Sequence, residues 1–142
     1  MVVDGSGAEV GIIELSSGLV TRRLGEDTVL LFVTPQGFYQ GDVTFFHTTT
    51  DCSGERFLSN NGGSLAYFAQ LSGSTVFYTT VSDRSSTPRT ENLNSYEVVT
   101  PGADPMAPGV CTATSMGDQP VGPAIAVTDP AFGGLVAPFR LR

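Results

Sequence analysis

The stretch FFHTTTDCSG, residues 45–54, contains the only histidine of the chain, His47, together with Asp51 and Cys52. A histidine, a carboxylate and a thiol this close in sequence are the residue types of a cysteine nucleophile and its general base. That chemistry requires the imidazole and the thiol to lie within hydrogen-bond reach of each other. The local backbone therefore decides between a catalytic pair and a structural role.

An extended strand keeps these side chains apart. Aromatic and β-branched residues predict a strand over Asp42–Thr50. Side chains alternate between the two faces of a strand, so His47 and Cys52 point to opposite sides unless a bulge forms near Asp51. Asp51 shares the face of His47 but lies about 13 Å away, too far to share one metal ion. We expect His47 to be a solvated or partly buried face residue.

The second cysteine, Cys111, suggests a simpler role for Cys52. Both lie on β-like segments of a chain that is rich in Ser, Thr and Gly and has no lysine, which we interpret as an exported disulfide protein. We expect a Cys52–Cys111 disulfide, with two buried free thiols as the alternative. The bond would close a loop of about 60 residues and contribute about 4 kcal/mol by the chain-entropy model.

Other motifs give weaker signals for chemistry. The segment Asp4–Glu9 resembles the start of a calcium loop, but Glu9 and Leu15 stand where an EF-hand needs Gly and Glu, so we interpret it as a β-turn before a strand. No Gly-x-Ser-x-Gly elbow is present. We expect no catalytic residue, no metal ion and no cofactor. A small hydrolase with paired carboxylates is a minor alternative, because the spacing of such pairs is three-dimensional.

Ligand contacts are expected from tyrosine and arginine. The chain has no tryptophan, so tyrosine and phenylalanine are the side chains left to stack on a sugar ring. Arginine can grip sulfate or carboxylate groups, although surface ion pairs are its commoner use. The candidate ligand-binding residues are Tyr39, Tyr67, Tyr78, Tyr96, Arg84 and Arg89.

The elements that position these residues are mostly strands. Apolar residues recur with period two, and no long window carries helical spacing. Strands are expected over 9–15, 28–33, 42–50, 64–71, 75–81, 95–100, 110–115, 124–128 and near 139–142, with a hairpin turn at 72–74, a further turn at 60–63, loops over 83–94 and 101–109, and a possible helical turn at 130–134. The pattern predicts one all-β domain over residues 1–142, an antiparallel sandwich or barrel of about nine to eleven short strands.

Composition excludes some partners. The net charge of −7 disfavours nucleic acid, whose phosphates an acidic surface repels. No segment approaches the roughly 20 apolar residues of a membrane span. Residues after Met1 lack the basic start and apolar core of a signal peptide, so we expect either a cytosolic protein or a domain cut from a longer exported chain. The cysteines favour the exported origin.

Three segments resemble one family. VVDGSGAEVG, FFHTTTDCSGERFL and VGPAIAVTDPAFGGLVAPFRL are similar to C-terminal β domains that follow collagen-like Gly-x-y repeats in bacterial extracellular proteins. The resemblance implies a trimer, since a collagen helix joins three chains, and an adhesin-like or phage-tail-like role at a surface. It also implies that a stalk and an export signal precede this domain.

The last dozen residues are unusually apolar for a free tail. They must pack on the core or on a neighbouring subunit, and the candidate oligomer interface consists of Phe132, Leu135, Val136, Phe139 and Leu141. The leading hypothesis is a non-enzymatic extracellular β domain that oligomerises, caps a stalk and binds a surface ligand. The alternative is a monomeric carbohydrate-binding module.

Overall fold

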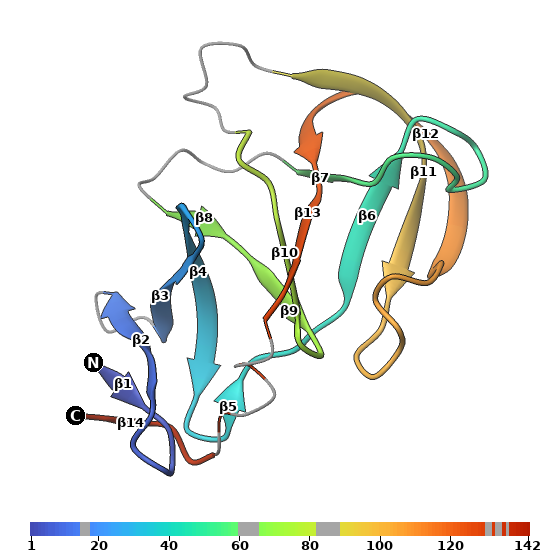
Figure 1. Cartoon of the computed structure of the whole chain (residues 1–142). Coiled ribbons are helices and arrows are strands. Elements are labelled where there is room, and N and C mark those ends of the chain that lie inside the picture. Colours follow the sequence, from blue (N-terminus) through green and yellow to red (C-terminus); the bar gives the residue numbers. More distant parts are fainter. Residues whose placement is uncertain (15–17, 60–65, 82–88, 130–131, 133–134, 136) are drawn as a thin grey trace.

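The computed structural model describes residues 1–14, 18–59, 66–81, 89–129, 132, 135 and 137–142. The chain forms two β-sheet lobes with a smaller sheet between them, and both termini lie together at the far end of one lobe (Figure 1). The prediction of an all-β, antiparallel domain is confirmed.

The first lobe, called the sheet lobe below, contains both termini. Six of its strands run side by side in the order β14 (Arg140–Leu141), β1 (Val2–Val3), β2 (Glu9–Glu14), β3 (Leu19–Leu24), β4 (Asp27–Thr34) and β5 (Gly37–Phe38). A seventh strand, β8 (Tyr67–Phe68), pairs in parallel with β4. Val2 lies opposite Leu141, so the first and last strands are direct neighbours.

A three-stranded middle sheet connects this lobe to a closed barrel. The middle sheet has the order β13 (Ile125–Thr128), β10 (Thr75–Tyr78) and β9 (Gln70–Ser72). The barrel, called the barrel lobe below, consists of β11 (Thr90–Val99), β12 (Val110–Pro123), β7 (Phe57–Ser59) and β6 (Val43–His47). All neighbours in these two units pair antiparallel.

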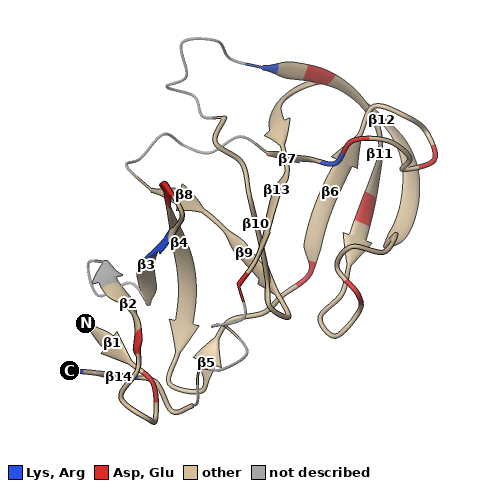
Figure 2. Ribbon diagram, viewed as in Figure 1, with Lys and Arg blue, Asp and Glu red and all other residues tan. Residues whose placement is uncertain are grey.

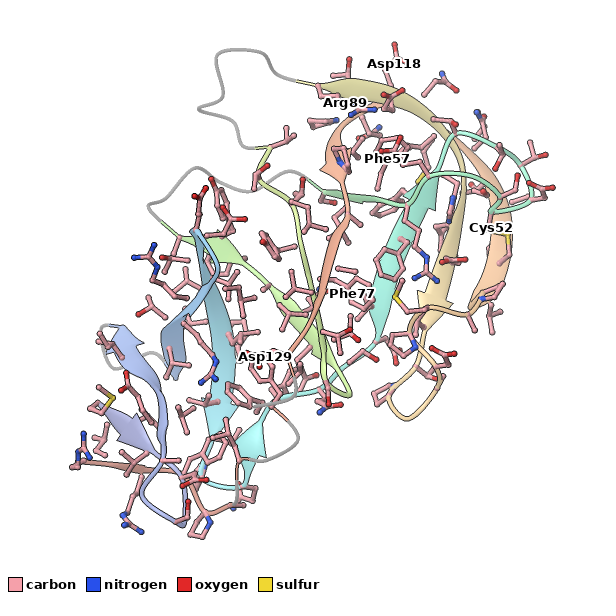
Figure 3. All side chains as sticks on the ribbon, viewed as in Figure 1. Cys52, Phe57, Phe77, Arg89, Asp118 and Asp129 are labelled. Carbon is pink, nitrogen blue, oxygen red and sulfur yellow. A yellow bond between two sulfur atoms is a disulfide. The ribbon has the colours of Figure 1, made fainter. Side chains whose placement is uncertain are left out.

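Alternation along β10 joins the two lobes into one packed body. Val76 and Tyr78 pack into the main core with residues of β2, β3 and β4, while Phe77 packs on Val43 and Phe45 of β6. The rings of Phe77 and Phe45 meet edge to face, with 4.9 Å between centroids. Phe77 lies between the two lobes in Figure 3. Because successive side chains face opposite lobes, all of β10 is buried.

Several predicted segments match the observed strands. The β9–β10 hairpin forms as expected, with Ser72 opposite Thr75 and Gly73 in the left-handed conformation. The loop predicted over 83–94 is partly wrong, because β11 begins at Thr90. Residues 83–88 of that predicted loop, the turn at 60–63 and most of 130–134 lie outside the described residues. β12 is longer than predicted, because it continues beyond Ser115. Gly117 has the left-handed backbone conformation, and the pairing of β12 with β11 shifts register beside it.

The prediction that the C-terminal apolar residues form an oligomer interface needs correction at two positions. Phe132 and Phe139 are buried in the main core of their own chain, each edge to face with Phe38. Leu135 packs partly against the same core, and Val136 lies outside the described residues. Among the four described members of this set, only Leu141 is well exposed. In the described part of the chain, no helix is long and apolar enough to cross a membrane.

Candidate functional site

The stretch that contains His47 and Cys52 forms a strand end and a disulfide. β6 ends at His47, and the following turn places Cys52 at a φ of 58°. Cys52 is bonded to Cys111 of β12, as predicted, and it lies at the outer side of the barrel lobe in Figure 3. The Ser95 hydroxyl accepts from the Cys52 amide (3.0 Å) and donates to the Thr49 carbonyl (2.6 Å), which fixes the turn on β11.

The expectation that His47 is solvated or only partly buried is wrong. The alternation of β6 places it on the same face as Val43 and Phe45, and it is 1% exposed. Its Nε2 lies 3.7 Å from a carboxylate oxygen of Glu97, which is also buried, and Arg56 forms an ion pair with the same carboxylate. A buried cluster of charged and polar groups therefore replaces the expected surface histidine.

An open hollow between the sheet lobe and the barrel lobe is the best candidate for a binding site, and we call it the aromatic hollow. Its volume is about 480 Å³, within the range of small-molecule sites. Segments from the sheet lobe, the middle sheet and the barrel lobe all contribute to it. The lining residues are Leu31, Phe32, Tyr39, Gly41, Asp42, Thr44, Phe46, Leu58, Ser59, Phe68, Ala69, Gln70, Leu71, Phe77 and Thr79.

Three large aromatic side chains of the hollow are exposed. Phe32 and Phe68 are each 50% exposed, and Tyr39 is 63% exposed. Alternation on β4 explains Phe32, because its neighbour Leu31 points into the core. Single exposed apolar residues are ordinary, but three around one hollow are typical of a binding surface.

The ring of Tyr39 lies close over Gly41. A Cβ atom at Gly41 would lie only 3.0 Å from Cε1 and Oη of Tyr39, so the ring rests directly on the Gly41 backbone. The Tyr39 amide also donates to the Phe32 carbonyl (3.0 Å). The absence of a side chain at Gly41 thus leaves the space in which the Tyr39 ring lies.

The polar groups of the hollow are nearly all uncharged. Its hydroxyl and amide side chains are those of Tyr39, Thr44, Ser59, Gln70 and Thr79. Among the described lining residues, Asp42 is the only one charged at neutral pH, and none is basic. In Figure 2 the middle strands β9, β10 and β13 carry no charged residue, and the acidic segment at the start of β6 contains Asp42. The hollow therefore favours neutral or cationic groups over anionic ones.

Of the predicted ligand-binding residues that the structure describes, only Tyr39 lines this hollow. Tyr67 and Tyr78 stack on each other with 6.1 Å between centroids, and Tyr78 is buried, so it is not available to a ligand. Burial and the hydrogen bond from its hydroxyl to Asp27 (2.6 Å) raise the pKa of Tyr78. Tyr96 lies on β11, opposite Phe46 and half-buried.

The two arginines of the predicted set lie elsewhere. Arg84 is outside the described residues. Arg89 forms ion pairs with Glu55 and Glu91 and covers the Phe57 ring at 5.2 Å, away from the hollow (Figure 3). The structure therefore does not bring the predicted set together. Sequence reasoning missed Phe32 and Phe68, although their outward positions on apolar strands are a usable signal.

The turn at Asp4 has the structural role that the sequence indicated. Asp4 Oδ1 accepts from the Ser6 amide (2.9 Å), the Ser6 hydroxyl (2.7 Å) and the Ala8 amide (2.8 Å). Within the ranges that the structure describes, no group of three or more His, Cys, Asp or Glu is arranged to hold a metal ion.

Comparisons of the chain with protein-family models, curated proteins and solved structures gave no match. The interpretation of the aromatic hollow therefore depends on its own geometry and chemistry.

Proposed function

We propose that this chain is a non-enzymatic extracellular binding domain whose aromatic hollow takes a neutral glycan. One observation carries this proposal: Phe32, Tyr39 and Phe68 expose their rings around a hollow of about 480 Å³. Aromatic rings offer flat apolar faces, and a sugar ring has apolar C–H faces that fit them, while its hydroxyls need donors and acceptors nearby.

The polar lining supports a sugar over other flat ligands. Gln70 offers both a donor and an acceptor, and Thr44 and Ser59 offer hydroxyls that rotate to either role. Asp42 accepts hydrogen bonds strongly from hydroxyls. Acidic glycans would place a second negative charge beside Asp42 in a chain of net charge −7, so neutral glycans fit best.

The disulfide supports the extracellular part of the proposal. Disulfides persist in oxidising environments, so the Cys52–Cys111 bond indicates a non-cytoplasmic location. An extracellular location fits a domain that binds glycans displayed at a surface.

A glycan array followed by titration calorimetry tests this function. We expect binding to neutral glycans, weakened about tenfold by Tyr39→Ala or Phe68→Ala if each loses about 1.4 kcal/mol of stacking. Val110→Ala is the matched control, because Val110 is an exposed apolar residue of β12 outside the hollow. Absence of glycan binding, or binding that neither aromatic variant weakens, would overturn the proposal.

Self-association is a second candidate function, favoured by the exposed apolar side chains Leu141 and Ile12. Leu141 lies on β14, the edge strand of the sheet lobe, and an uncovered edge is open to pairing with another copy. Because Val2 is opposite Leu141, a stalk before residue 1 would join the domain at the same edge. A trimer capping such a stalk predicts a mass of about 45 kDa by light scattering, reduced to about 15 kDa by Leu141→Asp. A monomeric mass of the unmodified chain would contradict it.

A further inference from the structure

We infer that the aromatic hollow is one end of a longer trough, so that the ligand is a glycan chain of several units. This inference rests on the proposed glycan-binding function. A second hollow of about 530 Å³ lies on the barrel lobe. Its lining residues are Phe46, Ser59, Leu93, Met116, Gln119, Pro120 and Val121.

The two hollows meet at Phe46 and Ser59, which line both. Phe46 is on β6 and Ser59 on β7, and these strands pair through Phe46 and Phe57. Ser59 in turn lies opposite Val121 of β12, which belongs to the second hollow. The junction is therefore built on paired barrel strands, which give it a rigid base.

The chemistry of the second hollow matches that of the first. Leu93 and Val121 are buried and form an apolar floor, with Phe46 and Met116 packed against them. The side-chain Nε2 of Gln119 donates to the backbone carbonyl of Met116 (2.9 Å), which leaves the side-chain oxygen of Gln119 turned to its acceptor role. None of the described residues that line this hollow is ionisable.

The sizes favour a chain over a single sugar. Each hollow alone lies within the volume range of a site for one small molecule, and the two share a boundary. A chain that fills the first hollow brings its next units to the second at high effective concentration. Affinity is then expected to rise with chain length until both hollows are occupied. Phe46, half-buried at the junction, would contact the units in the middle.

Titration calorimetry with cello-oligosaccharides and malto-oligosaccharides, from the monosaccharide to the hexasaccharide, tests this inference. We expect affinity to rise about tenfold or more from the disaccharide to the longer members of at least one series. Met116→Ala should weaken binding of the longer members about fivefold and leave the disaccharide unchanged. Gln119→Ala changes the same hollow at an exposed position, so it provides a second test if Met116→Ala unfolds the chain.

The outcomes separate this inference from the proposed function. Suppose that the disaccharide binds as tightly as the longer oligosaccharides, and that both variants bind all lengths like the unmodified protein. The inference of a trough is then wrong, while the proposed glycan site in the aromatic hollow stands. If neither series binds, the trough is wrong for these glycans, and the array decides separately whether the aromatic hollow binds sugars. Tyr39→Ala should weaken every length, which distinguishes the two hollows.

Discussion

The guanidinium of Arg56 and the carboxylate of Glu97 form an ion pair in the barrel lobe, with 2.5 Å between Nε and Oε1. Glu97 is almost fully buried. The other two guanidinium nitrogens of Arg56 donate to the carbonyls of Pro105 (2.6 Å) and Ala107 (2.9 Å). The guanidinium also lies 4.2 Å from the centroid of the Phe45 ring. One side chain therefore compensates a buried charge and anchors the loop over residues 101–109, which contains three prolines.

Removal of the Arg56 guanidinium should destabilise the fold strongly. Arg56→Met leaves the Glu97 carboxylate buried without its cationic partner, and such losses cost about 3–5 kcal/mol. Urea denaturation of the variant and the unmodified protein measures the difference. Arg89→Met is the matched control: its ion pairs with Glu55 and Glu91 are more exposed, and we expect a cost below about 1 kcal/mol.

The double variant Arg56→Met/Glu97→Gln checks the physical reason. A neutral amide costs less to bury than an unpaired carboxylate, so this variant should regain part of the lost stability. Equal stabilities of the Arg56→Met and Arg89→Met variants would contradict the buried-charge explanation.

The Cys52–Cys111 bond should contribute about 4 kcal/mol, because it restricts the unfolded chain across a long loop. The two cysteines are separated by 59 positions in sequence. Urea denaturation of a Cys52→Ala/Cys111→Ala variant should show this loss, and reduction of the unmodified protein should reproduce it. Stability that neither change reduces would contradict the prediction. Mass spectrometry of alkylated, unreduced protein should find no capped thiol.

Much of the fold was predictable because alternation is a local property. The strand at β6, the β9–β10 hairpin and the disulfide all follow from residue types and spacing. β3 was missed because its LVTRRL sequence carries two arginines. In the structure Arg22 donates to the Val10 carbonyl (2.9 Å) and covers the Phe132 ring, so packing offsets its polarity.

The buried cluster and the hollow depend on long-range contacts that the sequence does not display. His47, Arg56 and Glu97 come from separate segments, and only strand pairing brings them together. The hollow likewise joins β4, β6 and β9 across two lobes. Tyr39 was predicted as a ligand contact and lines the hollow, whereas Tyr78 is equally aromatic but buried between sheets. Residue type alone does not distinguish the two positions.

Tyr78 should make the protein lose stability at alkaline pH. Its pKa is raised in the folded state, first by burial and then by the hydrogen bond to Asp27. A tyrosine in the unfolded chain has the ordinary pKa of that side chain, about 10. Above this pH the unfolded state releases a proton that the folded state retains, so the free energy of unfolding falls by up to about 1.4 kcal/mol per pH unit.

Tyr78→Phe should remove this part of the alkaline loss. At neutral pH we expect the variant to be about 1–3 kcal/mol less stable, because the bond to the carboxylate is lost. Denaturation at several pH values between about 8 and 11 measures both effects. Tyr39→Phe, at an exposed position, is the control and should keep the alkaline decline. The same decline in Tyr78→Phe would refute the assignment.

Gly41→Ala tests the position of the Tyr39 ring without deleting the ring. The added methyl group would lie 3.0 Å from Cε1 and Oη of Tyr39, closer than ordinary contact, so the ring must shift. Because this ring is exposed and movable, the free energy of unfolding should change by less than about 1 kcal/mol. Glycan affinity should fall about as far as in Tyr39→Ala, since a displaced ring no longer stacks on the ligand. Calorimetry on both variants measures this, and full affinity in Gly41→Ala combined with weak binding in Tyr39→Ala would show that the resting place of the ring is unimportant.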